Sequence, residues 1–212
     1  MIVFGSSISP FVRKVLAFAA EKGVAVETRP NSFRSPDAAF LAASPFRKIP
    51  AMSDGDYSLA DSSAIVHYLE AKYPEPALIP TDPQQRGKVV WFDEFADTIV
   101  FGCFVKMFFN RIVGPRFMGV PGDEAVAAAA QVVEMPPILD YLETVVPGAG
   151  FLVGDRLTLA DLAVASPFVN LAHLDIAIDA GRHPKLKAYL DAILARPSFA
   201  AMIAEERQIL AA

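Results

Sequence analysis

Residues 2–15 of the chain read IVFGSSISPFVRKV, and this stretch decides the architecture of the first part of the molecule. The apolar run at residues 2–4 is typical of a short buried strand. Ser9 and Pro10 then occupy the N-cap and first helical positions, and apolar residues recur at helical spacing as far as Gly23. The stretch therefore predicts a strand that turns directly into a helix, with the Ser9 hydroxyl at the turn.

Strand and helix signals continue to alternate up to residue 74. Residues 24–28 alternate as a half-buried strand does, and Ser35-Pro36-Asp37 indicates the start of a second helix. Asp54-Gly55 lies between two strand-like runs and predicts a hairpin, and a third helix follows over residues 62–73. This order is typical of a small mixed sheet covered by helices.

Prolines 74, 76, 80 and 83 mark a stiff connection, after which strand signals fade. We therefore expect an α/β domain at residues 1–74, a linker at 75–86 and an all-helical domain at 87–212. Met135-Pro136-Pro137 should break or kink a helix of the second domain.

Composition excludes several classes of protein. Hydrophobic residues make up 53% of the 212 residues and charged residues 20%, which is typical of a packed protein and not of a disordered one. No stretch has the roughly 18 uncharged apolar residues that a membrane helix requires. Residues 1–4 lack the basic and apolar segments of a secretory leader, so we do not expect secretion. A net charge of −5 without basic clusters disfavours nucleic acid and anionic membrane.

The thiol and imidazole groups give no sign of a metal site or a disulfide. Cys103 is the single cysteine and lies within an apolar run, so we expect a buried, inert thiol and a reducing, cytoplasmic environment. His67, His173 and His183 lack metal-ligand spacing and are expected to be surface or packing residues.

Ser9 is the first candidate for chemistry. A capping serine is common, and on residue type alone that interpretation stands beside a functional one. A hydroxyl can accept a backbone N–H and still donate to a ligand, and a helix N-terminus favours anions such as a thiolate. A donor at that position could lower a thiol pKa of about 8.5 by one to two units.

Two further segments offer backbone and side-chain groups to a ligand. Pro50 precedes a strand, and a cis Ile49-Pro50 bond would turn the Ile49 backbone outward, where an extended peptide could pair with it. Asp61-Ser62 starts the third helix and supplies a carboxylate and backbone donors.

Together these segments resemble the glutathione transferase family, and in particular its serine-bearing bacterial branch. The matching stretches are residues 5–15, 44–52 and 59–69, with a fourth at residues 154–162. In the fourth, Thr158 and Asp161 form a predicted capping box, with Leu157 and Leu162 at the staple positions. Two positions differ from the family: Arg47 stands where many members have Gly, and Ser44 where many have Asn.

The resemblance implies a thioredoxin-like N-terminal domain, an all-α C-terminal domain and a cytoplasmic homodimer that uses glutathione as co-substrate without a metal. It assigns the sulfur to Ser9, with Ser6 and Ser7 as alternatives. The rest of the glutathione site is then Phe11, Arg34, Lys48, Ile49, Pro50, Asp61 and Ser62. Within this set Ile49 pairs with the cysteinyl backbone, Asp61 and Ser62 hold the γ-glutamyl end, and Lys48, with Arg34 or Arg47, faces the glycyl carboxylate.

The implied activity is detoxification, by conjugation of glutathione to small hydrophobic electrophiles or by reduction of peroxides. A glutathione-dependent isomerase or dehalogenase and a non-catalytic binding scaffold remain alternatives. Because position 9 is Ser and not Cys, a mixed disulfide with the protein cannot form there. The candidates to line an electrophile pocket are Phe11, Phe104, Met107, Phe108, Arg111 and Phe117. Aromatic residues at helical spacing are more often simply core residues, so core packing is the favoured interpretation of this set.

Overall fold

The computed structural model describes residues 1–30 and 37–211. Its contacts divide the chain into two compact units, Met1–Pro80 with Arg196–Ala212, and Thr81–Ala195. The sequence assigns residues 197–211 to the helical domain, whereas their contacts place them in the first unit. Arg34, which the resemblance assigns to the ligand site, lies outside the described residues.

The first unit contains a four-stranded mixed sheet, as predicted. Its strands are β1 (Ile2–Phe4), β2 (Glu27–Arg29), β3 (Ala51–Asp54) and β4 (Tyr57–Ala60), in the order β2-β1-β3-β4. β1 pairs in parallel with β2 and antiparallel with β3, and β3 and β4 form the predicted hairpin. Gly55 in its turn has φ +62°, a conformation that favours glycine.

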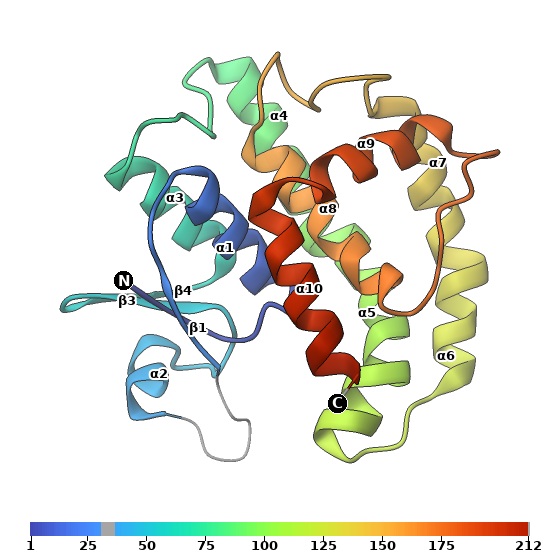
Figure 1. The fold of residues 1–212 in the computed structure, drawn as a ribbon, viewed down its shortest axis with the longest axis horizontal. Helices are drawn as coiled ribbons and strands as arrows, with labels where there is room; N and C mark the ends of the chain where they lie inside the picture. The colour runs from blue at the N-terminus through green and yellow to red at the C-terminus, as the bar shows by residue number, and fades with distance from the viewer. Residues whose placement is uncertain (31–36, 212) are drawn as a thin grey trace. The chain divides into compact units, whose positions relative to one another are not determined.

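Helices cover both faces of this sheet. Figure 1 shows α1 (Pro10–Glu21) and α3 (Ser62–Lys72) on one face and α2 (Ala38–Ala43) on the other. Because side chains alternate along a strand, Phe4 packs with Phe40 of α2 while its neighbour Val3 is buried on the opposite face. The helix α10 (Pro197–Ala211) packs against α1.

Two sequence predictions in this unit differ from the structure in extent. β2 begins at Glu27 and not near Val24, because β1 offers only three residues for it to pair with. The second helix begins at Ala38, where the Asp37 carboxylate accepts a hydrogen bond from the Ala39 N–H at 2.7 Å. Asp37 is therefore the capping residue, and Ser35 and Pro36 lie outside the described residues.

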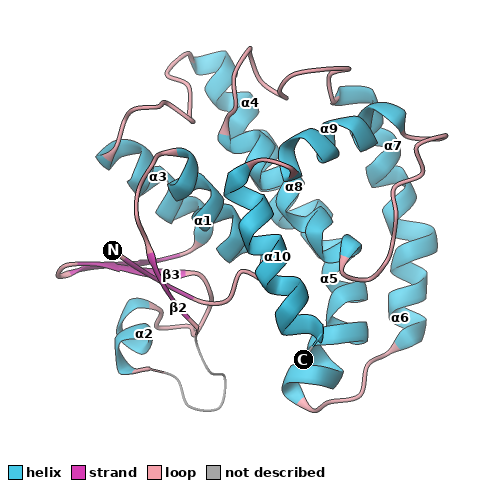
Figure 2. Ribbon diagram, in the orientation of Figure 1, coloured by secondary structure: helices cyan, strands magenta, loops and turns pink. Residues whose placement is uncertain are grey.

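The second unit is helical throughout its regular structure (Figure 2). Its α-helices are α4 (Pro83–Glu94), α5 (Phe101–Phe108), α6 (Glu124–Ala129), α7 (Met135–Val145), α8 (Leu159–Ala172) and α9 (Pro184–Leu194). Three π-helical segments, Phe95–Val100, Phe109–Met118 and Ala130–Glu134, adjoin α5 and α7. The predicted irregularity at Met135-Pro136-Pro137 is confirmed, since a π-helical segment ends there and the prolines occupy the first turn of α7.

The helix α8 forms the centre of the second unit, since its residues 159–171 are all buried. Thr158 and Asp161 form the predicted capping box at its start. The Asp161 carboxylate accepts hydrogen bonds from the backbone N–H groups of Thr158 and Leu152 and from the hydroxyl of Tyr189, at 2.8–2.9 Å. Among the described residues, no helix is both long and apolar enough to cross a bilayer.

Candidate functional site

Ser9 lies at the N-cap position of α1, with extended backbone and Pro10 as the next residue. Its backbone is engaged on both sides, because its N–H donates to the Ser6 carbonyl and its carbonyl accepts from the Arg13 N–H, each at 3.0 Å. Within the described chain its side chain makes no capping hydrogen bond. The predicted N-cap position of Ser9 is therefore confirmed, but its half-buried hydroxyl is not used to close the helix.

The two neighbouring serines are placed differently. Ser6 Oγ accepts a hydrogen bond from the Ile8 N–H at 3.4 Å, so this hydroxyl helps to shape the turn before the helix. Ser7 is buried. Of the three serines, Ser9 alone stands at the first turn of α1, where the unpaired N–H groups of a helix are located.

Gly5 forms the junction between this turn and the loop that contains Pro50. It has φ +131°, and a Cβ there would lie 2.6 Å from Cγ2 of Val12 and 3.2 Å from Cβ of Ile49. Only a glycine lets the three segments approach this closely. The contact places Ile49 beside the first turn of α1.

The loop before β3 is joined in turn to the start of α3. The Ile49-Pro50 peptide bond is cis, as the resemblance implies, and the Pro50 carbonyl accepts from the Asp61 N–H at 3.3 Å. Asp61 has φ +86°, and its carboxylate caps α3 by accepting from the Ala64 N–H at 3.0 Å. Ser62 follows and is buried.

The loop at residues 44–48 is closed by one side chain. Ser44 Oγ accepts from the Lys48 N–H at 2.9 Å and donates to the Lys48 carbonyl at 2.8 Å. Arg47 has φ +56°, which explains physically why glycine suits this position in the family. The side chains of Arg47 and Lys48 are exposed, and that of the preceding residue, Phe46, is 87% exposed.

The sequence did not reveal two residues that hold this site together. Arg13 and Lys14 are both buried; Lys14 Nζ donates to Ser63 Oγ at 3.3 Å, and Arg13 pairs with Glu206. A signal was available, because residues 10–21 offer α1 almost no polar face on which two adjacent cations could be solvated. The structure thus brings Ser9, Ile49, Pro50, Asp61 and Ser62 onto adjoining loops.

Half of the residues expected to line an electrophile pocket pack inside the second unit instead. Phe104, Met107 and Phe108 are buried, and Phe104 meets Phe168 edge to face at 5.1 Å. The Arg111 guanidinium is held by Glu124 at 2.6 and 3.0 Å and by Gln131 at 2.7 Å, and Phe117 is exposed. Phe11 lies in the first unit and is half-buried.

Cys103 is buried as expected, and burial raises the pKa of its thiol to about 11.

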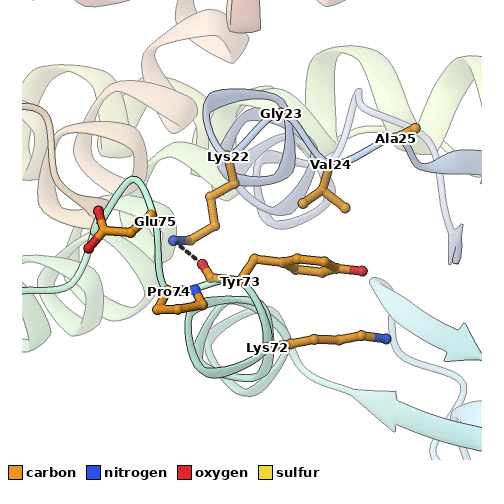
Figure 3. Close-up of a pocket in the computed structure, with 8 residues that line it drawn as sticks. All are labelled: Lys22, Gly23, Val24, Ala25, Lys72, Tyr73, Pro74 and Glu75. Atoms are coloured by element: carbon orange, nitrogen blue, oxygen red, sulfur yellow. Dashed lines mark hydrogen bonds between the residues drawn. The ribbon is translucent and has the colours of Figure 1, made fainter.

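A pocket of about 530 Å³ opens at the C-terminal ends of α1 and α3, the ends remote from Ser9 (Figure 3). The Lys22 ammonium beneath it donates to the carbonyls of Tyr73 and Pro76 at 2.7 Å and pairs with Glu70 at 2.7 Å. Lys72 is paired with Asp54. Both cations are thus committed to the fold, and the remaining charged residue of the lining is the exposed carboxylate of Glu75.

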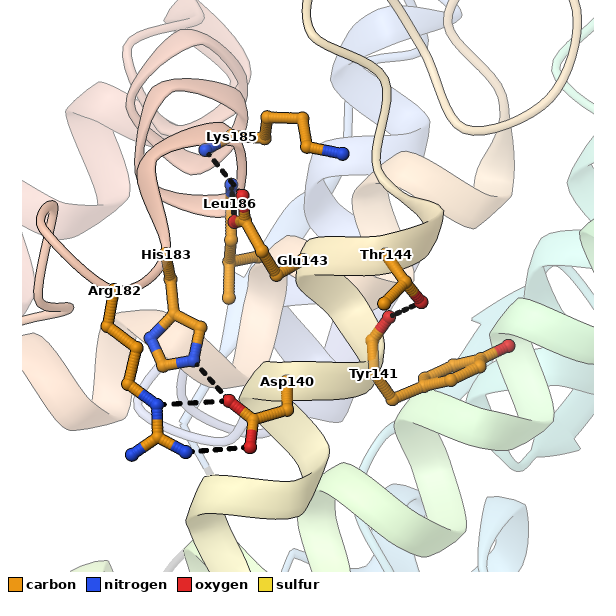
Figure 4. Close-up of polar contacts among 8 residues, drawn as sticks. All are labelled: Asp140, Tyr141, Glu143, Thr144, Arg182, His183, Lys185 and Leu186. Atoms are coloured by element: carbon orange, nitrogen blue, oxygen red, sulfur yellow. Dashed lines mark hydrogen bonds and ion pairs between the residues drawn. The ribbon is translucent and has the colours of Figure 1, made fainter.

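A polar cluster joins α7 to the start of α9 (Figure 4). Asp140 accepts from Arg182 at 2.7 and 3.2 Å and contacts His183 Nε2 at 2.8 Å, while the Glu143 carboxylate accepts the first N–H groups of α9. His183 is buried, so it is a packing residue as predicted. No group of three or more His, Cys, Asp or Glu side chains suited to a metal occurs in the part of the chain that the structure describes.

Comparison with known proteins agrees with this geometry. Residues 3–77 match the description "Glutathione S-transferase, N-terminal domain", and residues 95–197 match "Glutathione S-transferase, C-terminal domain". Glutathione S-transferase 3 of Zea mays is 31% identical over 210 residues, which cover 95% of this chain and 92% of that protein.

Solved structures show the same fold. Glutathione transferase F7 from Populus trichocarpa is 26% identical with a TM-score of 0.83, over 96% of this chain and 97% of that one. A glutathione transferase homologue from Drosophila mojavensis, solved with bound glutathione, is 25% identical with a TM-score of 0.82, over 99% and 94% of the two chains. The sheet with its three adjoining loops, the helical second unit and these relatives together establish that the chain belongs to the glutathione S-transferase family.

Proposed function

We propose that the protein binds glutathione along the loops of its first unit and lowers the pKa of the glutathione thiol, so that the thiolate attacks a small hydrophobic electrophile. One observation carries the proposal: the Ser9 hydroxyl stands at the N-terminus of α1 and is not used as its cap. A donor and a helix N-terminus both stabilise an anion. Each unit by which the thiol pKa falls corresponds to about 1.4 kcal/mol of preferential binding of the thiolate.

The adjoining loops supply the remaining contacts. The backbone of Ile49, before the cis Pro50, pairs with the cysteinyl residue of glutathione, as an added strand pairs with a sheet edge. Ser62 holds the γ-glutamyl carboxylate through its hydroxyl and N–H, and Asp61 holds the amine. Lys48, with Arg34 or Arg47, faces the glycyl carboxylate, and Phe11 completes the site.

The chemistry that follows is nucleophilic. The thiolate adds to an electrophilic carbon or displaces a leaving group from it, and a thioether forms while the leaving group departs or a proton is taken up. Residues 1–30 contain no cysteine, so no mixed disulfide between this segment and glutathione competes with that reaction. These features fit a serine-type transferase of the bacterial branch, working in the cytoplasm in detoxification.

We further propose that the protein works as a homodimer. Phe46 is 87% exposed in the first unit, and Trp91, Val132 and Val133 are half exposed or more in the second. Large apolar side chains in water favour association, which removes them from solvent. A second copy of the chain is the partner that this proposal assigns to them.

Isothermal titration calorimetry with glutathione tests the proposed function. Near neutral pH we expect binding to release up to about one proton per site, because the bound thiol ionises; titrations in buffers of different ionisation enthalpy measure this release. S-methylglutathione is the matched control: it should bind without releasing that proton, since its sulfur cannot ionise. Absence of binding at millimolar glutathione would instead favour a scaffold without transferase activity.

A further inference from the structure

The helix α1 is held against the C-terminal helix α10 by ion pairs near both of its ends. Close to its start, Arg13 Nε and Nη2 donate to the two carboxylate oxygens of Glu206 at 3.0 and 2.7 Å, and both side chains are completely buried. At its end, Arg196 donates to both oxygens of Glu21 at 2.8 Å, and Ser198 Oγ donates to one of them at 2.6 Å. Figure 1 shows α10 beside α1.

The contacts between the two helices have the same spacing on both of them, when the second contact is taken as the hydrogen bond from Ser198, on α10, to Glu21. Arg13 and Glu21 are eight residues apart on α1, and Ser198 and Glu206 are eight residues apart on α10. Each interval is about 12 Å along a helix axis. Because these contacts join 13 with 206 and 21 with 198, the helices run antiparallel, and a slide of either helix by one turn would break both of them. The contact of Arg13 with Glu206 therefore sets the axial position of the first turn of α1, and the contact of Ser198 with Glu21 sets that of its last turn.

The physical role of a buried ion pair is in its geometry more than in net stability. Removing two charges from water offsets most of their attraction, and well-packed apolar residues often replace such pairs without loss of stability. The bidentate arrangement of Arg13 and Glu206 nevertheless permits only one placement of the two side chains. The Glu21 end is more open to solvent, since 33% of the Arg196 side chain is exposed.

The first turn of α1 connects the buried pair to the proposed sulfur site. The Arg13 N–H donates to the Ser9 carbonyl at 3.0 Å, and the neighbouring Lys14 reaches Ser63 at the start of α3. We propose that the Arg13–Glu206 pair is a positioning device that holds the Ser9 hydroxyl and the N-terminus of α1 where they meet the glutathione sulfur. This inference rests on the proposed function. It makes α10, the last helix of the chain, a part of the thiol-activating apparatus.

The test is a double variant, Arg13→Met with Glu206→Leu, compared with wild type and with Arg196→Met. The double variant removes both charges of the pair together, because removing one partner alone would leave the other charge buried without it. Each protein is assayed for thermal unfolding, for the pKa of bound glutathione and for kcat/KM. Arg196→Met is the matched control, because it weakens the pair at the other end of the same two helices.

We expect the double variant to fold and bind glutathione but to raise the pKa of the bound thiol by about half a unit to one unit, a three- to tenfold loss in ionisation constant. Arg196→Met should lower the unfolding temperature without moving that pKa. A double variant whose thiol pKa and kcat/KM match wild type would overturn the inference alone. If the double variant does not fold, the same measurements are made on Glu206→Gln, which keeps the shape of the side chain. An unchanged pKa of the bound glutathione thiol in that variant would equally overturn the inference. Failure of the wild type to bind glutathione would overturn the proposed function and this inference with it.

Discussion

Asp61 combines a strained backbone with a carboxylate that caps α3 and that, in the proposed function, also binds the amine of glutathione. Its φ of +86° lies where L-residues are rarely found, and such conformations persist when the surrounding structure enforces them, often at ligand sites. The surrounding bonds are the Asp61 N–H to the Pro50 carbonyl and the Asp61 carboxylate to the Ala64 N–H. One carboxylate oxygen caps α3, which leaves the second for the amine that the proposed function assigns to it.

Two substitutions separate these roles. Asp61→Asn keeps an oxygen for the Ala64 N–H but loses the charge, so we expect a roughly tenfold weaker glutathione affinity, equal to about 1.4 kcal/mol, with stability almost unchanged. Asp61→Ala should lose the affinity and about 1 kcal/mol of stability as well, because the cap is gone. Calorimetry and urea unfolding of both variants measure the two effects, and wild-type affinity in Asp61→Asn would remove Asp61 from the ligand site.

For single residues, the sequence predicted positions within a helix better than it predicted side-chain hydrogen bonds and ion pairs. Ser9 and Pro10 stand where the pattern places them, because cap and first-turn preferences are local properties of the chain. The side-chain bond expected of Ser9 does not form, and the burial of Arg13 depends on Glu206, which is 193 residues away. No local pattern can report a partner at such a distance.

Among the elements, α8 shows how one carboxylate organises a helix start. Burial raises the pKa of Asp161, and the hydrogen bonds from Leu152, Thr158 and Tyr189 offset only part of that effect. The raised pKa means that the native state holds this proton more tightly than the unfolded chain. Burying the charged form of Asp161 costs stability, and this cost is present at pH values above its pKa. As the pH falls through that pKa the carboxylate is protonated, so the titration of Asp161 does not destabilise the native state.

Asp161→Ala should therefore cost more than loss of an ordinary cap. It leaves the buried Thr158 N–H, the partly buried Leu152 N–H and the Tyr189 hydroxyl without their acceptor, at about 1–3 kcal/mol for each buried group, so we expect a loss of roughly 3 kcal/mol or more in the free energy of unfolding. Thr158→Ala, the matched variant, should cost about 1 kcal/mol. Denaturant unfolding compares the two, and equal losses would show that the buried carboxylate does no more than the cap.

The elements themselves were predictable wherever their cause is local. The capping box, the hairpin at Asp54-Gly55 and the order of strands and helices are all confirmed. The predicted start of β2 was wrong, because β2 can pair only along the three residues of its partner strand β1. The π-helical segments beside α5 and α7 were not predicted, because a hydrophobic period of about 3.6 residues does not distinguish them from an α-helix.

For the whole molecule, the sequence predicted the family and fold class through four motifs that agree with one another. It assigned α10 to the helical domain, whereas ion pairs with α1 join α10 to the first unit. That difference matters to function, since the unit with the proposed sulfur site is built from both ends of the chain. In the proposed function, the first turn of α1 serves one event, the ionisation of a thiol beside Ser9.

The pKa of the glutathione thiol in the complex, followed by the ultraviolet absorbance of the thiolate against pH, tests that event most directly. In the wild type we expect a pKa one to two units below that of a free thiol, about 8.5. Ser9→Ala should bind glutathione with similar affinity and return the pKa toward the free value, while Ser6→Ala should leave it unchanged. A bound thiol with the same pKa in wild type and in Ser9→Ala would contradict the account.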